Sequence, residues 1–99
     1  MSNRITIKQL ESIVEGINRA TNSPLEPYTR DENGKWRANI GNFHLSQAYG
    51  GVELQRMVTE GGGVSCPAWN GHIPKREAAE RLWTFRNGLE YAKHESADA

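Results

Sequence analysis

The residue types that usually perform nucleophilic or metal chemistry are few and scattered in this chain of 99 residues. Its single cysteine, Cys66, has no charged residue within five positions, so no sequence neighbour would activate the thiol. Cys66 and His72 lie six apart, but with the distant His44 and His94 they do not make a closed zinc site. No nucleophile, base and orienting group occur together. We therefore expect no enzyme, no metal and no cofactor.

A basic pair, Lys75 and Arg76, follows Pro74, which is well suited to the first position of a helix. Backbone N–H groups at a helix start, together with two cations, would hold a phosphate. The alternative is a solvated basic face whose long side chains only cover apolar surface. Both interpretations stay open, and they stay open too for Arg81 and Arg86 further along the segment.

Aromatic residues flank the glycine-rich turns of the chain. Phe43 and Trp69 lie near such turns, and core packing is the default for Phe43. Tyr49 directly precedes two glycines, so its ring is expected at a rim, where it could stack on a base. We predict a ligand site in which Phe43 or Tyr49 supplies the aromatic face, and in which Lys75 and Arg76, helped by Arg56, contact phosphate.

The elements that must position these residues begin with a helix over residues 7–20. Thr6 and Gln9 form a capping box, and apolar residues then recur at helical spacing. Four runs with period-two alternation follow, separated by glycine-containing turns; they cover residues 28–30, 36–40, 43–48 and 52–59. We predict a four-stranded antiparallel meander, although the last run could also lie on one face of a helix.

An irregular stretch over residues 60–73 is predicted to be either functional or mobile, because compact domains seldom carry long loops. Its glycine triplet is not followed by Gly-Lys-Ser/Thr, which excludes a P-loop. A second helix is predicted from Pro74 to about Ala92. Its apolar stripe consists of Ala78, Leu82, Phe85, Leu89 and Ala92.

The predicted fold class is therefore α+β, one domain spanning residues 1–99, with a core over about 5–92 and a polar tail over 93–99. Both helices should pack on one face of the meander. The expected core residues are Leu10, Ile13, Ile17, Leu45, Leu54, Leu82, Phe85 and Leu89. Apolar residues make up only 36% of the chain, so stabilisation by self-association into a dimer or higher homo-oligomer is expected.

Composition gives no sign of a nucleic-acid or membrane partner. The 12 basic and 12 acidic residues cancel, and no apolar run is long enough to span a membrane. The N-terminal residues lack the apolar core of a signal peptide, and a single cysteine forms no intrachain disulfide. These features fit a reducing cytoplasm.

Three segments resemble a family of small bacteriophage proteins: RANIGNFHLSQAYGGV at residues 37–52, SPLEPYT at 23–29 and PKRE at 74–77. The family is that of the first-described Thoeris anti-defence proteins. Its members are sponges that sequester cyclic ADP-ribose-type signals made by host TIR proteins; some also hold cyclic oligonucleotides, and they assemble as oligomers. The resemblance covers roughly residues 5–92.

This resemblance implies a protein of the host cytoplasm that binds a cyclic nucleotide signal without turning it over. Two rival functions remain open on the sequence. One is a phage inhibitor that binds a host defence protein directly, which predicts a flat contact patch. The other is a small nucleic-acid-binding accessory protein, which predicts binding that weakens steeply with salt; the zero net charge counts against it.

Overall fold

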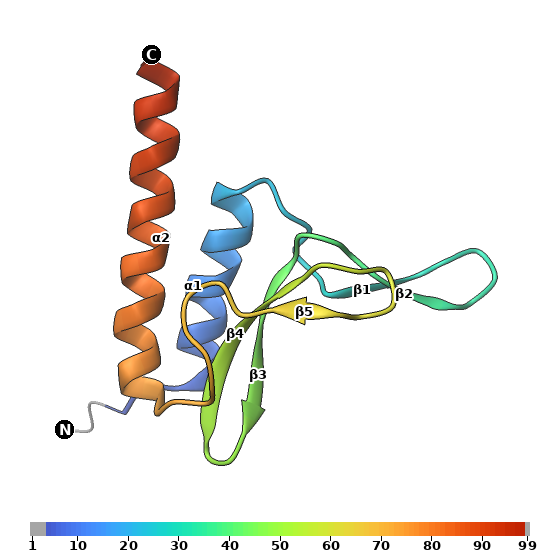
Figure 1. Ribbon diagram of the computed structural model, residues 1–99, viewed down its shortest axis with the longest axis horizontal. Helices are drawn as coiled ribbons and strands as arrows, with labels where there is room; N and C mark the ends of the chain where they lie inside the picture. The colour runs from blue at the N-terminus through green and yellow to red at the C-terminus, as the bar shows by residue number, and fades with distance from the viewer. Residues whose placement is uncertain (1–3, 99) are drawn as a thin grey trace.

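The computed structural model describes the backbone of residues 4–98 and the side chains of residues 4–94. The chain is α+β, with two helices and two antiparallel sheets (Figure 1). The elements are, in order, α1 (Ile7–Ala20), β1 (Tyr28–Arg30), β2 (Trp36–Ala38), β3 (Phe43–Ala48), β4 (Gly51–Met57), β5 (Val64–Ser65) and α2 (Lys75–Asp98).

The strands do not form the single four-stranded meander that the alternation predicted. β1 and β2 make a two-stranded sheet, and β3, β4 and β5 make a separate one in that order. The chain leaves the first sheet after β2, because Gly41, at φ 96°, donates its N–H to the Met57 carbonyl of β4. The run over 52–59 is a strand and not a helix, and the two-residue β5 was not predicted.

The first helix forms as its capping box predicted. The Gln9 backbone N–H donates to the Thr6 hydroxyl, and the Thr6 N–H donates to the Gln9 side chain. The helix covers residues 7–20 and is followed by Asn22 at φ 58°, a left-handed conformation typical of the residue after a helix. Its buried side chains lie on one stripe that faces the sheet and α2.

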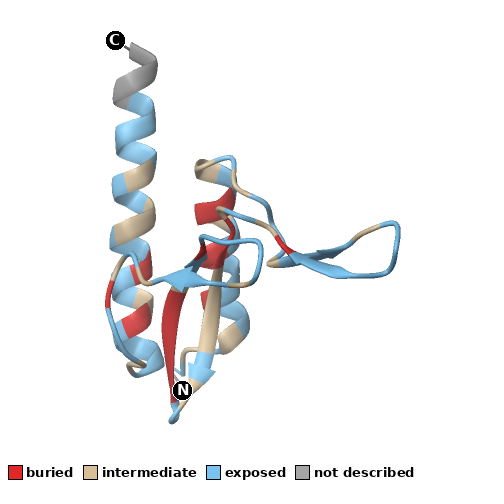
Figure 2. Cartoon of the chain, turned by 45° about the vertical axis from the view of Figure 1, so that its right-hand side comes forward, coloured by how far each residue is buried: buried red, intermediate tan, exposed pale blue. Residues whose placement is uncertain are grey.

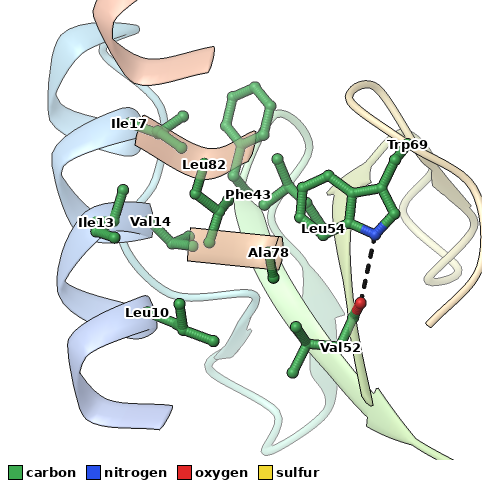
Figure 3. Close-up of a cluster of buried hydrophobic side chains, with 10 residues drawn as sticks. All are labelled: Leu10, Ile13, Val14, Ile17, Phe43, Val52, Leu54, Trp69, Ala78 and Leu82. Atoms are coloured by element: carbon green, nitrogen blue, oxygen red, sulfur yellow. Dashed lines mark hydrogen bonds between the residues drawn. The ribbon is translucent and has the colours of Figure 1, made fainter. Parts of the chain in front are cut away.

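The core lies between the two helices and the three-stranded sheet (Figures 2 and 3). Five of the expected core residues are buried, and the other three, Leu45, Phe85 and Leu89, are half-buried against the cluster. Trp69, in the segment after β5, also packs here and donates its indole N–H to the Val52 carbonyl at 3.3 Å. The stretch over 60–73 therefore contributes both a strand and a core residue.

Two parts of the chain extend beyond this core. The β1–β2 hairpin projects from the body, and the second half of α2 continues past the end of α1 (Figure 1). Residues 93–98, expected as a polar tail, continue α2, because no proline or glycine ends the helix there. The radius of gyration is 14.6 Å, against about 13 Å for a compact chain of this length. Within the described residues, neither helix is long and apolar enough to cross a membrane.

Candidate functional site

The predicted ligand-binding residues lie in two separate places. Phe43 and Arg56 are register partners where β3 begins and β4 is about to end. Phe43 is only 3% exposed and lies within the buried cluster (Figure 3). Its ring packs edge-on against Phe85, with ring centroids 5.8 Å apart. The Arg56 guanidinium lies over the Phe43 ring, 4.9 Å from its centroid. Phe43 is thus a core residue with a covered face, and Tyr49 remains as the exposed aromatic candidate.

The other three predicted residues, Tyr49, Lys75 and Arg76, lie toward the opposite end of the sheet, where only Lys75 and Arg76 share a hollow. Lys75 and Arg76, both exposed, line a shallow hollow of about 280 Å³ together with Gly50, the neighbour of Tyr49. The hollow also includes Arg4, which sequence reasoning missed. Nothing in the sequence places Arg4 here, because residues 4 and 50 come together only once β4 and α2 have packed on α1.

Gly51 brings the start of α2 against the β3–β4 turn. The Val52 N–H donates to the Ile73 carbonyl at 2.8 Å, and the Ile73 N–H donates to the Val52 carbonyl at 3.0 Å. A Cβ on Gly51 would lie 2.7 Å from the Ile73 carbonyl oxygen and 2.9 Å from the His72 carbonyl carbon. Only glycine therefore permits this approach, which sets Lys75 beside the turn.

The backbone of Tyr49 adopts a left-handed conformation that a tyrosine rarely occupies. It and Gly50 occupy the two central positions of the β3–β4 turn at φ 54° and 74°, the geometry of a type I′ turn. Asparagine and glycine adopt such values readily, whereas an aromatic residue is strained there. Tyr49 is 97% exposed, and among the described residues its only aromatic contact is a T-shaped one with His72, with ring centroids 5.9 Å apart.

A polar cluster backs this turn on the sheet face that points away from the helices. The Ser46 hydroxyl lies 3.1 Å from His72 Nε2. The Glu53 carboxylate accepts hydrogen bonds from the Gln55 amide at 2.9 Å and from the Gly71 N–H at 2.6 Å. These two bonds lower the pKa of Glu53 below its usual value. The bond from Gly71 also fastens the segment before α2 to β4.

The thiol in this cluster is poorly suited to nucleophilic chemistry. Burial, and a hydrogen bond to the Glu53 carboxylate, raise the pKa of Cys66. A raised pKa keeps the thiol protonated at neutral pH, whereas attack requires the thiolate.

Desolvation lowers the pKa of His44, whose ring nitrogen Nδ1 lies 3.1 Å from the Asn42 amide oxygen. Among the described residues, no three histidine, cysteine or acidic side chains group to hold a metal ion.

The end of the molecule around the β3–β4 turn therefore offers one coherent set of binding groups. Tyr49 presents an exposed aromatic ring, with the His72 imidazole in T-shaped contact. Arg4, Lys75 and Arg76 supply positive charge, and the first turn of α2 supplies backbone N–H groups. Such a set fits a ligand that carries both a flat ring and a phosphate.

Comparisons of the chain with protein-family models, with curated proteins and with solved structures give no match.

Proposed function

We propose that this protein binds and sequesters a cyclic nucleotide immune signal, a cyclic ADP-ribose isomer or a cyclic oligonucleotide, in the host cytoplasm. The observation that carries the proposal is Tyr49: an aromatic ring almost fully exposed, on a strained turn position, next in sequence to Gly50, which lines a cationic hollow. Neither packing nor turn geometry explains a tyrosine there. A base stacked on its face would explain it.

The charged side of the ligand would be held next to this ring. Arginine offers a planar fork that can bond two phosphate oxygens, and Lys75 adds a point charge. The acidic residue of the first helical turn, Glu77, is engaged by Arg81 at 3.1 Å, which reduces its repulsion of an anion at the site. Phosphate would meet Arg76, Lys75 and Arg4 together with backbone N–H groups of the first turn of α2.

Binding without turnover is part of the proposal. The Ser46 and His72 pair has no third group hydrogen-bonded to the imidazole within the described residues, and the Cys66 thiol stays protonated. The hollow, at about 280 Å³, is at the lower limit for enclosing a small ligand. We therefore propose that the active form is a homo-oligomer, in which a neighbouring copy covers more of the ligand.

Calorimetric titration with cyclic ADP-ribose isomers and cyclic oligonucleotides tests the proposal. Tyr49→Asn should cost roughly 1–3 kcal/mol of binding free energy, since it removes the stacking ring, while Tyr49→Phe should bind like the parent. Arg76→Ala should weaken binding about tenfold to a hundredfold. Lys93→Ala, which removes an exposed cation of the same helix outside the hollow, is the matched control.

The stability of the same variants separates a binding role from a structural one. Tyr49→Asn suits the left-handed turn better than tyrosine does and should not lower the free energy of unfolding. Unchanged affinity in both Tyr49→Asn and Arg76→Ala would place the site elsewhere. Absence of binding to every nucleotide would favour a direct inhibitor of a host protein, and polynucleotide binding that falls steeply with salt would favour a nucleic-acid accessory.

A further inference from the structure

The outer edge of β3 presents backbone groups that have no partner in the described chain. Backbone groups of an antiparallel strand alternate between its two sides. Phe43 turns its N–H and C=O away from β4, where the buried Asn18 amide bonds both, at 2.8 and 2.9 Å. Leu45 and Gln47 share this orientation, and in the described residues nothing bonds their N–H and C=O groups. β3 is therefore half capped by Asn18 and half open.

The outer edge of β1 is open in the same way. Asn39 donates to the Pro27 carbonyl and Asp31 donates to the Lys35 carbonyl, so alternate residues of β1 face away from β2. Those residues are Tyr28 and Arg30, and their backbone groups bond to nothing else described. Each edge thus offers two N–H and two C=O groups at a spacing of two residues.

The surroundings of the two edges are complementary in charge. A trough of about 490 Å³ runs beside β3, and its lining includes Glu11, Glu15 and Glu26. Glu15 pairs with Arg19 at 2.7 Å, whereas Glu11 and Glu26 make no ion pair with any described residue. The projecting hairpin carries three cations, Arg30, Lys35 and Arg37, beside the acidic Asp31 and Glu32 of its turn. Arg37 pairs with Asp31 at 3.1 Å, so Arg30 and Lys35 are the hairpin cations that form no ion pair with a described residue.

The hairpin also exposes apolar surface that the chain itself leaves uncovered. Trp36 is 64% exposed and Tyr28 is 44% exposed, while Leu25 lies half-exposed in the wall of the trough. The hairpin cannot turn back onto its own trough, because residues 25–27 form part of the trough wall and lead directly into β1. In Figure 1 it points away from the rest of the molecule. A partner for it must come from another molecule.

We propose that two copies of this chain exchange their β1–β2 hairpins, with β1 of each adding to the open edge of β3 in the other. The hydrogen bonds come from the backbone groups of Tyr28 and Arg30 on one copy and of Leu45 and Gln47 on the other. Arg30 and Lys35 of each hairpin meet Glu11 and Glu26 of the facing trough. This inference gives an interface to the proposed homo-oligomer and does not depend on which ligand is bound.

A charge-exchange experiment tests the pairing with the full-length protein. The trough variant carries Glu11→Lys and Glu26→Lys, and the hairpin variant carries Arg30→Glu and Lys35→Glu. By light scattering, the parent should show at least twice the chain mass and each variant alone the chain mass. An equimolar mixture should recover the parental mass, because in a mixed pair both contacts again join opposite charges.

Hydrogen exchange reports on the strand pairing itself. The amides of Tyr28, Arg30, Leu45 and Gln47 should exchange slowly in the parent and in the mixture, and at least tenfold faster in either variant alone. Far-UV circular dichroism checks that both variants stay folded, and Tyr49→Asn should keep the parental mass. A monomeric parent would overturn both this interface and the homo-oligomer. Variants that stay associated, or a mixture that stays dissociated, would overturn the interface alone; the ligand proposal is judged by calorimetry.

Discussion

Tyr49 occupies a turn position at which asparagine or glycine would cost the chain less. Its exposed ring is the feature that most needs a function, because almost none of its surface is buried by the fold. The sequence singled it out through the two glycines that follow it. What the sequence did not reveal was the positive φ of Tyr49, since turn type depends on the register of β3 against β4.

Protonation of Glu53 should lower the free energy of unfolding at acid pH. Hydrogen bonds from Gln55 and Gly71 hold its pKa below the ordinary value, so the folded state favours the carboxylate. The resulting stabilisation is present above the pKa of the unfolded chain and is lost as pH falls through the lower pKa of the folded state. Glu53→Gln should therefore lower the unfolding free energy by about 1–3 kcal/mol at neutral pH.

Urea denaturation at a series of pH values measures this effect. The difference between Glu53→Gln and the parent should begin to shrink as pH falls below the unfolded-state pKa of glutamate, about 4.3, and should vanish only below the lower pKa of the folded state, where the carboxyl is protonated in both states. Glu32→Gln, at an exposed carboxylate of the hairpin turn, is the control and should change stability by less than about 0.5 kcal/mol. A Glu53→Gln difference independent of pH would contradict the account.

At the scale of elements, the approach of the segment before α2 to β4 should tolerate only glycine at position 51. Gly51→Ala places a Cβ within 2.7 Å of the Ile73 carbonyl oxygen, so the backbone must move. The expected cost is about 1–3 kcal/mol of unfolding free energy, as for other overpacked sites. Ligand affinity should fall as well, because the movement carries Lys75 away from the turn.

Gly61→Ala is the matched control for this change. A Cβ at Gly61 meets nothing within 4 Å, and the residue does not need a positive φ. Thermal unfolding should therefore shift for Gly51→Ala and barely for Gly61→Ala. Equal melting temperatures for the two variants would show that the backbone beside the Val52–Ile73 bridge has room for a Cβ at position 51.

Most elements could be predicted because their signals are local. The capping box of Thr6 and Gln9 fixed the start of α1, and the spacing that includes Leu82 marked the buried stripe of α2. The division into two sheets depends on long-range bonds, such as that from Gly41 to the Met57 carbonyl, which alternation within a strand cannot reveal. For the same reason, the sequence grouped Phe43 with Tyr49 although they lie at opposite ends of β3.

At the scale of the whole molecule, the chain combines a small core with two extensions. Two of its exposed large apolar side chains, Tyr28 and Trp36, belong to the projecting hairpin, and its ligand hollow is shallow. Both features are accounted for if the protein works as an assembly. The low apolar content of the sequence pointed the same way, but it could not indicate which surfaces meet.

The central claim is that the protein holds an intact cyclic nucleotide. Native mass spectrometry, after mixing with an extract of cells whose TIR signalling is active, tests it most directly. The account predicts a bound mass equal to that of a cyclic nucleotide, released unchanged when the protein is heated and absent from the Tyr49→Asn, Arg76→Ala double variant. Recovery of a linear or hydrolysed product, or no bound nucleotide on the parent protein, would contradict it.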